Sequence, residues 1–184
     1  NINALGLAGA SSPDLTRLGR LFAQRGAPAS ALATLGDWID PDRAVREGGA
    51  EDAYYLALPV PHLAANGPML RVAELGAVKH MTPRALAALL PFLSALPAGT
   101  AVNVNTAPAE VLAALADNLS GDALEAFLAE RTRKPFTTVA EFRARLPDGA
   151  TLASDFGLAV NSNYFHVTME ARQGATRSRA RALV

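Results

Sequence analysis

The sequence predicts an α+β protein in which one discontinuous domain, residues 1–65 and 152–184, encloses an inserted helical domain, residues 66–151. Two observations lead to this prediction. Apolar residues recur at helical spacing through the middle of the chain, whereas beyond Phe156 they alternate with polar residues as in a β-strand. A two-stranded hairpin alone is marginally stable in water, so the closing strands need a surface, and the opening segment is the nearest candidate.

The opening segment is expected to contain two helices. Ser12 is placed to cap the first helix, with Pro13 in its first turn and Asp14 at the positive end of the helix dipole. Gly26 ends this helix, and a second short helix follows over residues 31–39. The side chains expected on the buried faces are Leu15, Leu18, Leu21 and Phe22 in the first helix, and Leu32, Leu35 and Ile39 in the second.

The middle of the chain is a series of short helices separated by proline and glycine. A stiff connector, residues 58–68, leads into them, and we place a domain boundary there. The side chains expected to cap these helices are Thr82, Thr106, Ser120 and Thr138. Thr138 stands three residues before Glu141, which is the spacing of a capping box. The apolar residues expected inside are Ala85, Leu86, Leu89, Leu90, Val111, Leu112, Leu115, Leu124, Phe127, Leu128, Phe142 and Leu146.

The closing segment is expected to form two strands joined by a turn at residues 172–174. Residues 164–171 alternate between apolar and polar side chains, so the first strand is expected to be half-buried. Residues 176–184 alternate again and place three arginines on one face, which is typical of a solvent-facing edge strand protected by charge. A brief extended segment is also expected at residues 102–105.

The composition sets limits on the class of protein. Half of the 184 residues are apolar, which allows a substantial core, and the absence of cysteine excludes disulfides, thiolate metal sites and cysteine nucleophiles. Seventeen basic and 17 acidic residues give no net field that would attract nucleic acid or a membrane. The sequence contains no run of about 18 apolar residues. It begins with Asn1 rather than Met, which is typical of a mature fragment or a truncation that has lost an N-terminal anchor.

Carboxylates are concentrated in residues 37–52, a stretch broken by Pro41 and a pair of glycines. Its acidic residues are Asp37, Asp40, Asp42, Glu47, Glu51 and Asp52. Oxygen ligands on an irregular loop are what Ca²⁺ takes, with about 6–8 oxygens, and the neighbouring Trp38, Tyr54 and Tyr55 can anchor such a loop to a core. The spacing lacks the glycine and terminal glutamate of an EF-hand. A solvated acidic loop, which is the commoner case, and an irregular Ca²⁺ site therefore both stay open from the residues alone.

Six short blocks stand in order along essentially the whole chain. They are Asn1–Leu5, Asp37–Asp42, Gly49–Tyr55, Glu74–Leu75, Asn103–Ala107 and Asn161–Phe165. In this order they resemble the type II secretion system protein K family, the large minor pseudopilins of the general secretion pathway. The resemblance implies a pilin-like α/β domain carrying an inserted all-α domain of helix-hairpin-helix or SAM-like units.

The resemblance also implies a place and partners for the protein. We expect a subunit at the tip of the periplasmic pseudopilus of a Gram-negative bacterium, in complex with minor pseudopilins I and J. It is expected to be held in the inner membrane by a single N-terminal helix that this sequence lacks. Family members bind calcium, so the resemblance favours Ca²⁺ at the acidic stretch. The candidate ligands are Asp37, Asp40, Asp42, Glu51 and Asp52.

A helix-hairpin-helix module that binds nucleic acid is the alternative prediction. Such hairpins offer a Gly-x-Gly turn whose backbone N–H groups meet a phosphate, and neither matching turn, residues 77–81 or 117–121, contains one. The local positive cluster consists of Arg131, Arg133 and Lys134, with Arg143 and Arg145 nearby. With zero net charge, the sequence favours a helix-hairpin-helix-like scaffold used for protein contacts.

An enzyme is not predicted. The three histidines, His62, His80 and His166, lie in different segments, and neither His-Glu-x-x-His nor Gly-x-Ser-x-Gly occurs. Carboxylates that are bunched in one loop serve a metal more readily than an acid/base pair with separated pKa values. We therefore expect no catalytic residues.

Overall fold

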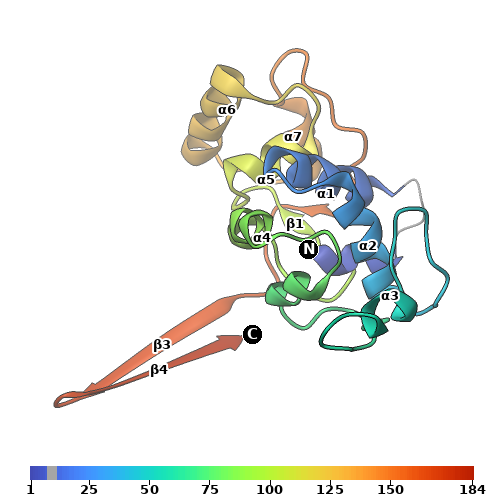
Figure 1. Ribbon diagram of the computed structural model, residues 1–184. Helices are drawn as coiled ribbons and strands as arrows, with labels where there is room; N and C mark the ends of the chain where they lie inside the picture. The colour runs from blue at the N-terminus through green and yellow to red at the C-terminus, as the bar shows by residue number, and fades with distance from the viewer. Residues whose placement is uncertain (8–11) are drawn as a thin grey trace.

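Two apolar cores organise the molecule. The computed structural model describes residues 1–7 and 12–184, and Figure 1 shows helices gathered around these cores while a long hairpin extends away from them. The first core is built mainly by the opening half of the chain, and the second by residues 104–158. We call the surrounding parts the first lobe, residues 1–98, and the second lobe, residues 102–160.

Helices and turns make up the first lobe. In chain order they are η1 (Ile2–Leu7), α1 (Pro13–Gln24), α2 (Ala29–Ile39), α3 (Asp52–Leu56), η2 (Val72–Ala77), α4 (Pro83–Leu89) and η3 (Leu90–Phe92). α1 and α2 pack against each other and against η1, whereas α4 packs against η2 and η3. The large side chains that are fully enclosed here are Ile2, Phe22, Leu35, Tyr55, Met69, Leu75 and Leu89. In the described part of the chain, no helix has the length and apolar character needed to cross a membrane.

Side-chain caps begin two helices of the first lobe where the sequence predicts them. The hydroxyl of Ser12 accepts from the backbone N–H of Asp14 at 3.2 Å, and that of Thr82 accepts from Ala85 N–H at 3.1 Å. Each bond satisfies a donor that has no partner inside the helix. The prediction that Leu90 is buried is wrong, because α4 ends one residue earlier and the side chain turns to solvent.

A parallel pair of two-residue strands joins the ends of the second lobe. Its elements are β1 (Val102–Asn103), α5 (Ala109–Leu115), α6 (Gly121–Arg133), α7 (Val139–Ala144) and β2 (Leu158–Ala159). β1 pairs with β2, with Val102 opposite Leu158, which confirms the first half of the expected extended segment; residues 104–106 form a turn. Phe127, Phe136 and Phe142 interlock in the core with ring centroids 5.5, 5.7 and 5.3 Å apart. Such stacked and edge-on aromatic pairs add to the stabilisation that burial gives.

The predicted caps of the second lobe are confirmed only in part. α5 begins two residues later than a cap at Thr106 requires, and Pro108 occupies the N-cap position, so that prediction is wrong. At α7 the hydroxyl of Thr138 accepts from Glu141 N–H at 3.0 Å, which is one half of the predicted capping box. The carboxylate of Glu141 accepts instead from Thr137 N–H at 2.8 Å, one residue before the cap.

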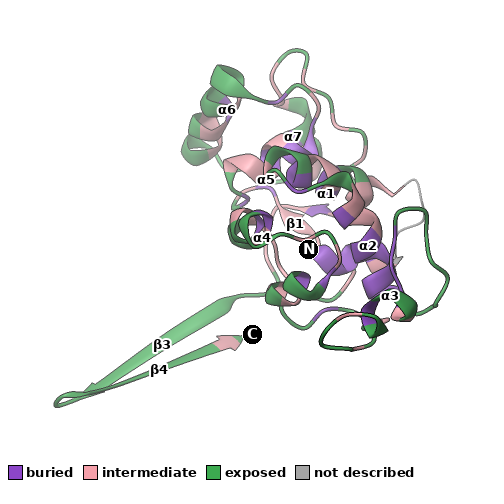
Figure 2. Ribbon diagram, viewed as in Figure 1, coloured by how far each residue is buried: buried purple, intermediate pink, exposed green. Residues whose placement is uncertain are grey.

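The closing strands form the predicted hairpin, but not in the predicted place. β3 (His166–Gln173) and β4 (Thr176–Leu183) pair antiparallel over their whole length. Every residue of β3 is exposed, and Figure 2 shows the hairpin extending away from both lobes. The expectation that it packs on the opening segment is therefore wrong. The alternating pattern identifies an apolar face, but the helices of the opening segment already bury their own apolar faces in the first core.

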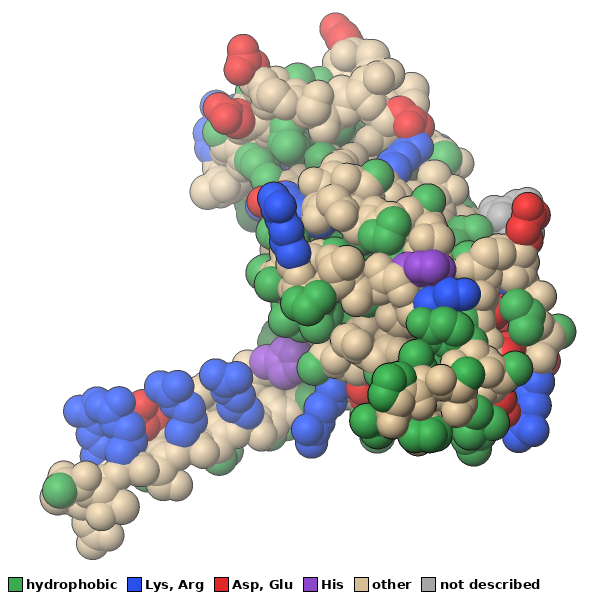
Figure 3. Space-filling model, in the orientation of Figure 1, with side chains coloured by type: hydrophobic (Ala, Val, Ile, Leu, Met, Phe, Trp, Pro, Cys, Tyr) green, Lys and Arg blue, Asp and Glu red, His purple; other side chains and the backbone are tan. Residues whose placement is uncertain are grey.

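The two faces of the hairpin differ in chemistry. One face carries Val167, Met169 and Ala171 opposite Ala182, Ala180 and Ser178. The other carries four arginines and one acid, and Figure 3 shows this row of basic side chains along the hairpin. Arg172, Arg177 and Arg179 all lie within 3.3 Å of Glu170. The charged face confirms the expectation of a solvent-facing strand, whereas the apolar face is left uncovered by the described residues.

The predicted domain boundaries near residues 65 and 151 stay a prediction. Ala64 and Met69, on either side of the first boundary, lie in the same core. Ala150 and Leu152, on either side of the second, both pack against the other core. Two arginines of α1 and its C-cap residue, Arg25, tie the two lobes together. Arg17 donates to the carbonyls of Phe156 and Ser154, Arg20 pairs with Asp117, and Arg25 pairs with Glu110.

Candidate metal centre

The acidic arm, residues 40–51, joins the end of α2 to the start of α3. Asp40 is the C-cap residue of α2, and Glu51 is the N-cap residue of α3. The arm folds back on itself so that Asp40, Asp42 and Glu51 each offer a carboxylate oxygen within 4.8 Å of the other two. Residues far apart on the arm therefore converge at its base, where two helix ends meet.

Two of these three carboxylates are enclosed without a hydrogen-bond donor. Glu51 is 4% exposed, and both its oxygens are inaccessible and lack a hydrogen bond among the described residues; the oxygens of Asp40 are in the same state. Burial raises the pKa of Glu51, and the nearby charges of Asp37 and Asp40 raise it further. Burial also raises the pKa of Asp40, against the opposing effect of Arg46. Enclosed carboxylates of this kind require a proton or a cation.

The structure brings three of the five predicted ligands together and leaves the other two beside them. Asp37 is fully buried and accepts from the backbone N–H of Arg46 through both oxygens, at 3.4 and 3.3 Å. Asp52 accepts from Ala64 N–H at 3.0 Å. Asp37 and Asp52 therefore have backbone partners of their own, whereas Glu51 has none among the described residues. Sequence spacing could not separate these two groups.

Aromatic rings support the base of the arm from inside the first lobe. Trp38 and Tyr55 are buried and meet edge-on with centroids 5.1 Å apart, which fits the predicted anchoring role. His62, to which the sequence assigned no role, packs against Tyr55 at 5.2 Å. The hydroxyl of Tyr55 accepts from Lys79 N–H at 3.3 Å. This packing fixes the first turn of α3, and with it the position of Glu51.

The donor set fits a hard divalent cation. It consists of carboxylate oxygens alone, on an irregular loop, with unpartnered oxygens that converge within the reach of one ion. Oxygen-only sites on flexible loops are characteristic of Ca²⁺ rather than of zinc or copper. The enclosed oxygens of Glu51, which have neither a hydrogen-bond donor nor an ion pair among the described residues, are the observation that distinguishes this arm from a solvated acidic loop.

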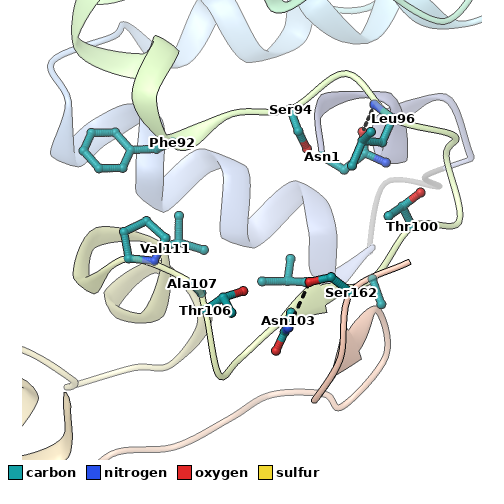
Figure 4. A pocket seen from close by; sticks show the side chains of 13 residues that line it. Asn1, Phe92, Ser94, Leu96, Thr100, Asn103, Thr106, Ala107, Val111 and Ser162 are labelled. Carbon is teal, nitrogen blue, oxygen red and sulfur yellow. Dashed lines mark hydrogen bonds between the residues drawn. The ribbon is translucent and has the colours of Figure 1, made fainter. Parts of the chain in front are cut away.

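A separate cavity lies where the lobes meet, but its lining offers little chemistry. Its volume is about 240 Å³, and Figure 4 shows Asn103, Thr106 and Ser162 on one side and Phe92 and Val111 on another. Asn103 donates to the hydroxyl of Ser162 at 2.9 Å. The lining side chains are neutral, so the cavity provides no acid/base pair.

Two arginines of the positive cluster on which the nucleic-acid alternative rests are engaged within the protein. Arg131 donates to the carbonyls of Val104 and Ala107. Arg145 lies 3.3 Å from Glu130 and 3.4 Å from Glu141, and its guanidinium stacks on the ring of Phe136. These side chains hold the second lobe together and do not form a free basic surface.

Comparison with known proteins gives a consistent result along the chain. Two family models described as type II secretion system (T2SS), protein K match residues 1–98 and residues 102–167. A type II secretion system protein K of Aeromonas hydrophila is 37% identical over 153 residues, covering 78% of this chain and 46% of that protein. The Pseudomonas aeruginosa protein of the same name is 36% identical over 144 residues, covering 78% of this chain and 43% of that protein. The chain thus spans about half the length of these curated relatives.

The fold has a close counterpart among solved structures. A chain in the crystal structure of the GspK-GspI-GspJ complex from the enterotoxigenic Escherichia coli type 2 secretion system superposes with a TM-score of 0.84 and 28% identity. The match covers 100% of this chain and 69% of that chain. The hairpin is therefore included in the likeness, although most of it lies beyond the residues that the family models match.

Proposed function

This chain belongs to the type II secretion system protein K family, and on that premise we propose that it is a minor pseudopilin at the tip of the pseudopilus. In this role it forms a complex with minor pseudopilins I and J, which starts or caps the assembly and assists protein export across the outer membrane. The observation that carries the proposal is the likeness, over the whole chain, to a chain of a complex named for K, I and J.

The exposed hairpin supports this role. A two-stranded ribbon with one apolar face is marginally stable in water, and a pilin-like sheet would give its Val167 and Met169 side chains a surface to cover. The lobes support it as well, because a large helical mass fits poorly in the middle of a fibre of repeated subunits. A subunit unlike its neighbours can end such a heterologous assembly.

Calcium at the acidic arm is a second part of the proposal. Asp40, Asp42 and Glu51 would hold the ion, with Asp37 and Asp52 beside them as the remaining candidate ligands. A bound ion supplies the positive charge that offsets the repulsion between these carboxylates. The protein's own part is to carry the ligands at the end of α2 and the start of α3, so that occupation of the site ties the two helices together.

The proposed location follows from the same role. The described residues would form a periplasmic domain, anchored in the inner membrane of a Gram-negative bacterium by a single helix that precedes them. The proposed role is structural rather than catalytic. It uses shape, partner contacts and a bound cation, and none of these requires a reacting group.

Co-purification tests the assembly. We expect the protein, produced with the periplasmic domains of its own minor pseudopilins I and J, to elute with both as one complex. Met169→Asp, on the apolar face of β3, should weaken the complex, because a carboxylate cannot be buried there without a partner. Thr168→Asp, the adjacent residue on the charged face, is the matched control and should leave assembly intact. Elution of the wild-type chain alone would contradict the proposed function.

A further inference from the structure

Arg46 reaches from the acidic arm back into the carboxylate cluster. Its Nη2 lies 2.7 Å from Asp40 Oδ2, and its Nε lies 3.7 Å from Asp37 Oδ1. The side chain of Arg46 is 43% exposed, whereas those of Asp37 and Asp40 are 0% and 6% exposed. One partly solvated guanidinium therefore serves two enclosed carboxylates.

The guanidinium neutralises the cluster incompletely. Its contact with Asp40 is close enough for an ion pair but lacks hydrogen-bond geometry, so the Asp40 oxygens stay without a donor among the described residues. The oxygens of Glu51 have no donor either. A single positive charge thus faces Asp37, Asp40, Asp42 and Glu51, and a deficit of positive charge remains at the base of the arm.

The position of the guanidinium depends on the absence of a side chain at Gly36. Arg46 lies against this residue of α2, and a Cβ at Gly36 would collide with Arg46 Nη1. The backbone of Arg46 is held separately, since its N–H donates to Asp37 and its carbonyl accepts from Gly49 N–H at 2.8 Å. The exposed side chain can therefore leave the cluster while the loop backbone keeps its place.

We propose that Arg46 is a built-in counter-ion that occupies the cluster in the metal-free protein and is displaced when a divalent cation binds. The inference rests on the proposed cation site and adds a competitor to it. The guanidinium of Arg46 and a bound divalent cation are both positively charged, so each weakens the binding of the other to these carboxylates. This coupling is reciprocal. The guanidinium keeps the arm folded without metal, and the same contact weakens the affinity for the ion.

Two substitutions remove the competitor in different ways. Arg46→Gln deletes the positive charge. Gly36→Ala displaces the side chain of Arg46 from the cluster but leaves its charge on the loop. Alanine is also a better helix former than glycine, so this change should not weaken α2. For Arg46→Gln we expect the Kd for Ca²⁺ to fall by about tenfold, since a unit charge a few ångströms from a divalent ion is removed. Gly36→Ala should shift the Kd in the same direction by a smaller factor.

The measurement is calorimetric titration of the metal-free wild-type protein and each variant with calcium chloride, paired with thermal melting without metal. Arg43→Gln is the matched control, because Arg43 lies on the same arm, is 76% exposed, and approaches only Asp52, at 3.8 Å; its Kd should change by less than about twofold. Without metal, Arg46→Gln should melt at a lower temperature than wild type. Arg46→Lys, which keeps the charge, should bind calcium more weakly than Arg46→Gln.

The outcomes separate this inference from the site on which it rests. If wild type binds calcium and Arg46→Gln binds it equally or more weakly, Arg46 organises the ligands and does not compete, and the inference is wrong while the site stands. If wild type shows no binding heat at millimolar calcium, both the site and the inference are contradicted. A tighter Kd in Arg46→Gln and Gly36→Ala, with Arg43→Gln unchanged, supports the displacement.

Discussion

Two carboxylates of the first lobe and one of the second are held in opposite ways. In the first lobe, Asp40 and Glu51 are enclosed without hydrogen-bond donors, and their pKa values are raised. In the second lobe, Glu141 accepts from the N–H and the hydroxyl of Thr137, and these hydrogen bonds lower its pKa to about 2. Lys134 and Arg145 add further positive charge near Glu141.

This difference separates a carboxylate with a structural role from the two enclosed carboxylates that we propose as cation ligands. Glu141 completes a local network and stabilises the start of α7 without outside help. Glu51 destabilises the metal-free first lobe, because an ionised group without a partner is costly to enclose. At Asp40 the ion pair with Arg46 offsets part of that cost. Ligand binding to the folded state alone would reverse that cost. The network around Glu141 is complete in itself, whereas the proposed cation would complete the carboxylate cluster of the first lobe.

The largest expected effect on stability comes from the core of the second lobe, and it tests whether calcium acts on the first lobe alone. Phe142→Ala should cost about 3–5 kcal/mol of unfolding free energy, because the ring is fully buried within the aromatic cluster. Denaturant unfolding of this variant with and without calcium measures the loss. The stabilisation by calcium should be the same as in wild type, since the proposed site lies in the other lobe. Phe156→Ala, an exposed phenylalanine, is the control and should lose less than about 0.5 kcal/mol.

Calcium itself should produce the next largest effect. At a concentration of about 100 times its Kd, the ion should stabilise the protein by about 2.7 kcal/mol, because it binds only the folded state. Glu51→Gln should abolish most of this gain, as it removes an enclosed ligand. Glu47→Gln, on the exposed part of the same arm, should keep it. Thermal melting across a calcium titration is the measurement, and an equal response in both variants would contradict the ligand assignment.

A substitution at the junction of the two lobes should lower the unfolding free energy by a somewhat smaller amount. Arg17→Met removes the donor to the carbonyls of Ser154 and Phe156, which are 2.7 and 2.6 Å away. Leaving them without this donor should cost about 1–3 kcal/mol. Arg84→Met on the exposed side of α4 should cost little. A loss in Arg17→Met no greater than in Arg84→Met, measured by denaturant unfolding, would show that the lobes do not depend on this contact.

The smallest expected effect is a pH dependence at Glu141. Because its folded pKa is lowered to about 2 from an ordinary value of 4.5, its stabilising contribution is present above pH 4.5 and is lost as the pH falls towards 2. Glu141→Gln should therefore melt below wild type at pH 7, and the gap should close in acid. The control is Glu125→Gln on α6 at the same pH values. A gap that stays constant down to pH 2 would contradict this account.

Local signals in the sequence predicted local structure well. Ser12 and Thr82 cap their helices as expected, because the cap depends only on residues within one turn. The alternating pattern also predicts the two closing strands, although β3 runs on through Arg172 and Gln173, which were expected in the turn. Thr106 failed as a cap because Pro108, two residues on, occupies that position. Competition between neighbouring residues decided the start of that helix.

Features that depend on contacts between residues distant in the sequence could not be predicted from the sequence alone. The alternation of β3 reveals an apolar face but not what covers it, so the predicted packing of the hairpin was wrong. The acidic stretch was recognised as a candidate cation site, yet only the folded arm separates Asp40 and Glu51 from Asp37 and Asp52. The role of Arg46 depends on its approach over Gly36, and no spacing rule predicts such a contact.

Hydrogen–deuterium exchange of the metal-free protein, with and without calcium, tests the central claim most directly. Adding calcium should slow exchange at the end of α2 and the start of α3, where Asp40 and Glu51 converge. Exchange in α6 and α7 of the second lobe should not change. Exchange that is unaffected by calcium in α2 and α3, or slowed equally in both lobes, would contradict the claim that the first lobe alone is completed by a cation.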